Sequence, residues 1–116
     1  MKNLQVKFRL WIDNENGKTV LGDGRWRLLE TIGKTGSLSR TCKKLNISYR
    51  KAWGDLAKMH QALRMPLIEK HRGGLNGGDT HLTDYGKNFI NAYKKLHIEI
   101  EKDIKNKSSK YLRLVK

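Results

Sequence analysis

The order of structural elements along this chain predicts a mainly α, α+β fold. Three observations carry the prediction: an apolar alternation at residues 4–12, two short helices with a tight turn over residues 37–63, and a strand, glycine loop and strand over residues 67–82. The last two, in this order, are typical of a winged helix-turn-helix. At 116 residues, the sequence suits one modest core.

The N-terminal residues predict a β-hairpin. Apolar side chains alternate with mostly polar ones, as in a half-buried strand, at Leu4, Val6, Phe8, Leu10 and Ile12. The pair Asn16-Gly17 tolerates positive φ and favours a turn, after which residues 19–21 can return as a second strand.

Two helices are expected next, each with its own start signal. Asp23 is the expected cap of the first, which Gly33 and Gly36 interrupt. Ser37 is the expected cap of the second, over residues 38–45.

A helix-turn-helix is predicted by the residues that follow. Cys42 is small enough for a close helix crossing, Asn46 enters the left-handed region cheaply, and Ile47 fills the space between the helices. Ser48 then caps a third helix, with Ala52, Trp53, Leu56 and Leu63 at helical spacing. The same spacing would suit an ordinary helical hairpin in a core, so spacing alone leaves both interpretations open.

The glycine-rich stretch "RGGLNGGDTHLT", residues 72–83, favours a wing. A phosphate-binding loop of the Walker type needs a Gly-Lys-Ser/Thr ending and a helix directly after it. The stretch has no Gly-Lys-Ser/Thr ending. A strand at residues 80–82 is expected after the glycines, in place of a helix, and another at residues 67–71 before them. The glycines could let the backbone approach DNA closely, or they could form a hairpin tip without contacts.

A long helix is expected to follow Thr83, its predicted cap. Its apolar stripe is too long for one small domain to cover, which predicts a homodimer through Phe89, Tyr93, Leu96, Ile100 and Ile104. Alternatively, the helix folds back over its own sheet. The expected division is a DNA-binding unit at 1–83, a dimerisation helix at 84–107, and a loose basic tail at 108–116.

Charge narrows the class of partner. The chain has 25 Lys plus Arg against 11 Asp plus Glu, a formal net charge of +14, which favours a polyanion such as nucleic acid.

One cysteine excludes an internal disulfide and suits a cytoplasmic protein, and the N-terminus resembles neither a signal peptide nor a membrane span. The four histidines match no zinc pattern, and we expect no metal, no cofactor and no active site.

Two segments carry a family resemblance. "GSLSRTCKKLNISYRKAWGDLAKMHQ" and "RGGLNGGDTHLTDYG" resemble the DNA-binding domain of the molybdate-responsive regulators (ModE), within the LysR-type winged-helix group. The likeness covers roughly residues 4–105. It implies a homodimer, paired through the long helix, that binds a palindromic operator in double-stranded DNA. It places Ser48, Tyr49, Arg50 and Lys51 at the start of the recognition helix, with Arg72, Gly73 and Gly74 opening the wing.

One departure limits what the resemblance implies. The full-length regulators continue into molybdate-binding domains, whereas this sequence ends at Lys116, so we expect no molybdate site in it. Leu75, Asn76 and Asp79 also stand where the family tends to glycine or lysine.

The sequence therefore predicts a sequence-specific DNA-binding transcription regulator. The alternative is an architectural protein that binds DNA or RNA without sequence choice. The candidate DNA-contacting residues are Ser37, Ser39, Ser48, Tyr49, Arg50, Lys51, Lys58, Lys70, Arg72, Gly73 and Gly74.

Overall fold

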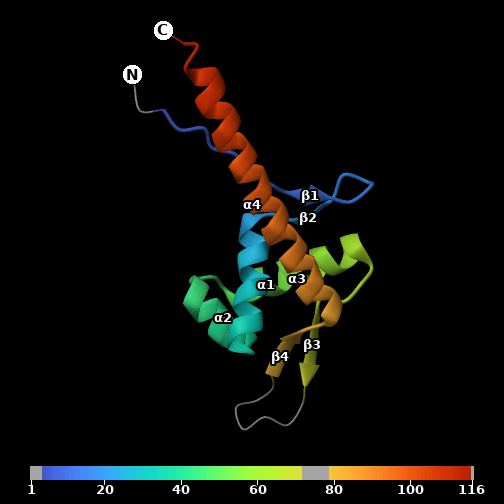
Figure 1. The fold of residues 1–116 in the computed structure, drawn as a ribbon. Coiled ribbons are helices and arrows are strands. Elements are labelled where there is room, and N and C mark those ends of the chain that lie inside the picture. Colours follow the sequence, from blue (N-terminus) through green and yellow to red (C-terminus); the bar gives the residue numbers. More distant parts are fainter. Residues whose placement is uncertain (1–3, 72–78, 116) are drawn as a thin grey trace.

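The computed structural model describes residues 4–71 and 79–115, and it confirms the mainly α fold (Figure 1). Within these residues the helices are α1 (Asp23–Thr35), α2 (Leu38–Leu45), α3 (Tyr49–Leu63) and α4 (Asp84–Leu112). One antiparallel hairpin pairs β1 (Ile12–Asp13) with β2 (Thr19–Leu21), and a second pairs β3 (Ile68–His71) with β4 (Asp79–Leu82). None of the helices in this part of the chain is long and apolar enough to cross a membrane.

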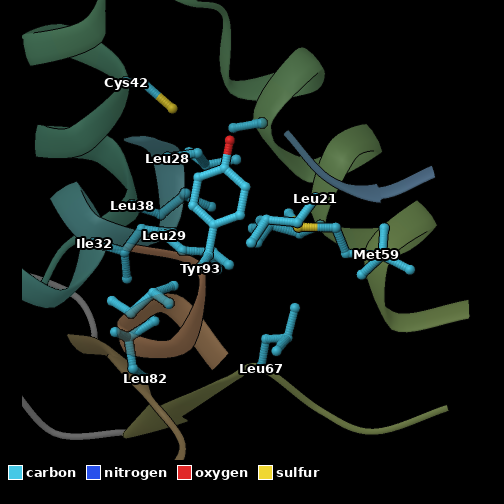
Figure 2. Packing of buried hydrophobic residues seen from close by; sticks show 14 residues of the cluster. Leu21, Leu28, Leu29, Ile32, Leu38, Cys42, Met59, Leu67, Leu82 and Tyr93 are labelled. Carbon is cyan, nitrogen blue, oxygen red and sulfur yellow. The ribbon is translucent and has the colours of Figure 1, made fainter. Parts of the chain in front are cut away.

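One apolar core joins all four helices. Figure 2 shows the Tyr93 ring of α4 among buried side chains from α1, α2, α3, β2 and β4. Burial of this surface away from water is the main force that holds the helices together. The largest fully buried side chains are Leu21, Leu28, Leu29, Ile32, Met59, Val20 and Thr41.

Side-chain caps fix where three of the helices begin, as the sequence predicts. Each capping hydroxyl accepts a hydrogen bond from a backbone N–H in the first turn, which would otherwise lack a partner. The bonds run from Arg40 N to Ser37 Oγ (3.2 Å), from Lys51 N to Ser48 Oγ (3.0 Å) and from Gly86 N to Thr83 Oγ1 (3.0 Å).

The start of α1 differs from the prediction. Gly22, in extended backbone, is the N-cap residue and supplies no capping side chain, while Asp23 is the first helical residue. Asp23 still suits its place, because its carboxylate faces the positive end of the helix dipole and lies 3.6 Å from the Arg27 guanidinium.

The predicted strand over residues 4–12 is wrong in its extent. Only Ile12–Asp13 pairs with β2, and residues 4–11 lie outside any strand. These residues instead run beside α4, where the Tyr93 hydroxyl donates to Leu10 O at 2.7 Å and the Phe8 ring lies 4.9 Å from that of His97. Of the predicted apolar face, Phe8, Leu10 and Ile12 are partly buried, whereas Leu4 and Val6 are exposed. A strand also needs a partner, and the short β2 cannot pair with the whole segment.

The second hairpin is held against α1. Its register pairs Ile68 with Leu82 and Lys70 with Thr80. The Thr80 N–H donates to the carbonyl of Gly36 at the end of α1, at 3.0 Å. β3 and β4 thus form a wing that packs on α1 and the start of α4 (Figure 1). The loop glycines Gly73, Gly74, Gly77 and Gly78 lie outside the described residues.

The last helix reaches far beyond the rest of the fold. Its first turns pack on α1 and β4, and its later half projects away (Figure 1), giving extents of 63 × 31 × 23 Å. The helix continues to Leu112, so the segment from residue 108, expected to be a loose tail, is mostly helical.

Candidate nucleic-acid interface

The turn between α2 and α3 has the predicted helix-turn-helix geometry. Asn46 adopts the left-handed conformation with φ of 56°. The next amide, of Ile47, donates to Cys42 O at 3.0 Å, which closes the end of α2 and turns the chain into α3. Ile47 is half-buried against the core, as expected for a residue that fills the space between two crossing helices.

Cys42 lies where the two helices cross. Its thiol is buried and lies 3.9 Å from Ser48 O, to which it can donate. Burial raises the pKa of the Cys42 thiol, so the group stays protonated and acts as a small packing residue. Within residues 4–71 and 79–115, no three His, Cys, Asp or Glu side chains gather where they could hold a metal ion.

The first turn of α3 is presented to solvent. Ser48, Tyr49, Arg50 and Lys51 are all exposed. A helix N-terminus carries partial positive charge and free backbone N–H groups, so this turn is suited to an anion. The four residues that the resemblance assigns to recognition therefore form one accessible surface.

The two basic side chains in this turn differ in their electrostatic surroundings. Lys51 Nζ lies 3.3 Å from Asp55 Oδ2, one turn along α3, and Arg25 Nε lies 3.9 Å from the other oxygen of that carboxylate. Arg50 makes no ion pair with any residue that the structure describes. Its guanidinium is therefore the freer of the two to bind a base or a phosphate.

The remaining predicted contacts are spread over several elements. Ser39 is exposed on the first turn of α2, whereas Ser37 is half-buried because its hydroxyl caps that helix. Lys58 is exposed two turns along α3 from Arg50. Arg72, Gly73 and Gly74 lie outside the described residues.

A basic groove around Lys58 was not predicted from the sequence. It lies between the tip of the first hairpin and the second half of α3, with Lys18, Arg25 and Arg64 among its lining residues. Arg25 is held in place because its guanidinium donates to the carbonyls of Thr19 and Val20. These cations come from the first hairpin, the start of α1 and the second half of α3, and only tertiary structure brings the first two beside the third.

Trp53 links the first turn of α3 to the second hairpin. The Tyr49 and Trp53 ring centroids are 6.1 Å apart in an edge-to-face arrangement. On Trp53, the Lys70 ammonium of β3 lies 4.3 Å from the ring centroid, within the range of a cation–π interaction. Lys70 thus connects the wing strand to the helix that carries the exposed basic turn.

The apolar stripe of α4 divides into an inner and an outer part. Phe89 and Tyr93 pack against the chain's own core. Leu96 is 43% exposed, and Ile100 and Ile104 are partly exposed on the projecting half of the helix. The outer residues are therefore the ones available to a second protein surface.

Comparison with known proteins identifies relatives of this chain. The chain is 40% identical over 93 residues to the molybdenum transport protein ModE of Azotobacter vinelandii, covering 80% of this chain and 34% of that protein. It is 39% identical over 96 residues to the transcriptional regulator ModE of Haemophilus influenzae, covering 83% and 36%. The DNA-binding transcriptional dual regulator ModE of Escherichia coli K12 is 39% identical over 72 residues, covering 62% and 28%.

The matched region coincides with the winged helix-turn-helix. The chain spans only about a third of the length of the first two relatives. The family model for bacterial regulatory helix-turn-helix proteins of the lysR family matches residues 24–87, which run from the start of α1 into α4. The chain therefore belongs to the LysR family of bacterial regulatory helix-turn-helix proteins.

Proposed function

We propose that this chain is a sequence-specific DNA-binding transcription regulator that acts in the cytoplasm. The observation that carries the proposal is the exposed basic turn at the start of α3, directly after a helix-turn-helix bend. Two of the three relatives described above are named as transcriptional regulators, and one of these as DNA-binding. A third relative is named a molybdenum transport protein, but this chain covers only about a third of it. We therefore propose DNA binding alone for this chain.

In the proposed complex, the first turn of α3 enters the major groove. Arg50 contacts a base edge, because a guanidinium matches the paired acceptors of guanine. Lys51 contacts a phosphate, because its ammonium is a point charge without the paired donors that would match a base edge. The wing lies on the adjacent sugar-phosphate backbone of the DNA. Its proposed contacts are Lys70, Arg72, Gly73 and Gly74, with Ser37 and Ser39 at the start of α2 on a neighbouring phosphate.

Selection of duplexes from a random-sequence pool tests this proposal. A DNA-binding regulator should enrich one sequence, and a dimer should enrich an inverted repeat whose half-sites lie about one helical turn apart. Tight binding with no enriched sequence, or preference for RNA, would instead support the architectural alternative.

Arg50→Ala should weaken binding to the enriched duplex by about 1–3 kcal/mol and leave binding to random duplex nearly unchanged, if the guanidinium reads a base. Lys51→Ala is the matched comparison, because a lost phosphate contact should weaken both complexes alike. Fluorescence anisotropy with labelled duplexes measures both. Equal losses on the two duplexes for Arg50→Ala would make Arg50 a phosphate contact.

We also propose that two chains pair through the projecting half of α4. The support is the exposure of Leu96 and the partial exposure of Ile100 and Ile104 on one helix. Packing this stripe against a second copy would remove apolar surface from water, which an isolated projecting helix cannot do. A two-fold dimer also matches the symmetry of an inverted-repeat operator.

Ile104→Glu should convert this dimer to a monomer, because a carboxylate placed in an apolar seam must be desolvated without a partner. Light scattering should give twice the chain mass for the wild type and the single-chain mass for the variant. Asn106→Glu, which adds the same charge at an exposed position of α4, should stay dimeric. A wild-type monomer at micromolar concentration would disprove the seam.

A further inference from the structure

We propose that Tyr49 determines DNA sequence preference by placing its ring against the 5-methyl group of a thymine in the major groove. This inference rests on the proposed function and names the base that one residue recognises. Tyr49 is the first residue of α3 and lies next to Arg50, yet it is 49% exposed. A large aromatic side chain on a basic surface contributes little to the core when half of it remains in water.

The ring is held in place before any DNA arrives. Its edge-to-face contact with Trp53, at 6.1 Å between centroids, restricts the Tyr49 side chain. Trp53 is itself half-buried against the core, and the Lys70 ammonium lies 4.3 Å from its ring centroid. Three side chains from α3 and β3 therefore lie in contact, with Trp53 between the exposed side chains of Tyr49 and Lys70. Preorganisation of this kind lowers the entropy lost on binding.

The chemistry of the exposed Tyr49 side chain points to thymine. In the major groove, thymine differs from the other bases by its C5-methyl group, which apolar side chains contact. The Tyr49 ring offers the apolar surface on this turn, between the hydroxyl of Ser48 and the cation of Arg50. Arg50 reading a guanine and Tyr49 reading a nearby thymine would together specify two base pairs in each half-site.

Replacement of thymine by deoxyuridine tests the proposal, because it removes the methyl group and leaves base pairing intact. Each thymine of the enriched duplex is replaced in turn, at the equivalent position of both half-sites. At one position, wild-type affinity should fall about fourfold per half-site, the factor that corresponds to burying one methyl-sized group. Tyr49→Phe should retain this dependence, because it keeps the ring, whereas Tyr49→Ala should lose it.

Three results of the deoxyuridine measurements would overturn the proposal: equal wild-type affinity for every substituted duplex, a methyl dependence that survives Tyr49→Ala, or one that disappears in Tyr49→Phe. The last would assign recognition to the Tyr49 hydroxyl instead. An enriched duplex without thymine in its half-sites would also contradict it. Thermal unfolding of each variant shows whether it is folded. If Tyr49→Ala does not fold, the methyl dependence of Tyr49→Phe still tests the proposal. Failure to enrich any sequence would contradict the proposed function itself.

Discussion

Gly86→Ala is expected to destabilise the fold by about 3 kcal/mol, at the upper end of the cost of overpacking. Gly86 lies in the first turn of α4, where an added Cβ would meet the carbonyl oxygen of Leu67 at 2.4 Å. That oxygen also accepts the Thr83 N–H at 3.0 Å, so neither backbone segment can move without loss of a hydrogen bond at the start of α4. Denaturant unfolding of both proteins gives the difference.

Gly54→Ala is the matched control for this change. Gly54 is exposed in the middle of α3, and an added Cβ there would meet nothing within 4 Å. Alanine should therefore stabilise the helix by about 0.5–1 kcal/mol through backbone entropy alone. Equal stability of Gly86→Ala and the wild type would show that α4 does not start as closely against Leu67 as described.

Affinity for DNA is expected to fall about a thousandfold between about 50 and 200 mM salt, the loss expected from roughly six phosphate contacts per dimer. The physical reason is counterion release from the duplex by a chain with a formal net charge of +14. A titration of the dissociation constant against salt gives the slope. Affinity that hardly changes over this range would exclude the extended phosphate contact that the basic surface implies.

The same titration tests Lys58 and the basic groove around it. Lys58→Ala should reduce the slope by about two for a dimer, one phosphate for each chain. Lys102→Ala, at an exposed position on the projecting half of α4, should leave the slope unchanged. An unaltered slope for Lys58→Ala would confine the DNA contact to the start of α3 and the wing.

Local chemistry explains the parts of the fold that could be predicted from the sequence. Ser37, Ser48 and Thr83 can each satisfy a backbone N–H within their own first turn, so their role is readable without tertiary structure. Asn46 is equally local, since its left-handed conformation follows from its own side chain and backbone. These four residues place the start and end of α2 and the starts of α3 and α4.

Features that depend on distant partners were not predictable in the same way. The alternation at residues 4–12 marks an apolar side, but nothing in it shows that α4 would be its neighbour in place of a second strand. The Lys70 ammonium could equally have pointed to solvent, and only the structure places it on Trp53. The groove that joins Lys18, Arg25 and Arg64 likewise has no signal in sequence spacing.

The ratio of two dissociation constants at physiological salt decides whether the chain recognises DNA sequence. One is for the duplex enriched by selection, and the other is for a random duplex of equal length. Specific recognition through α3 predicts that the enriched duplex binds at least about a thousandfold more tightly. A ratio near one would contradict a sequence-specific regulator, because the charge of the chain would then account for all of its affinity for DNA.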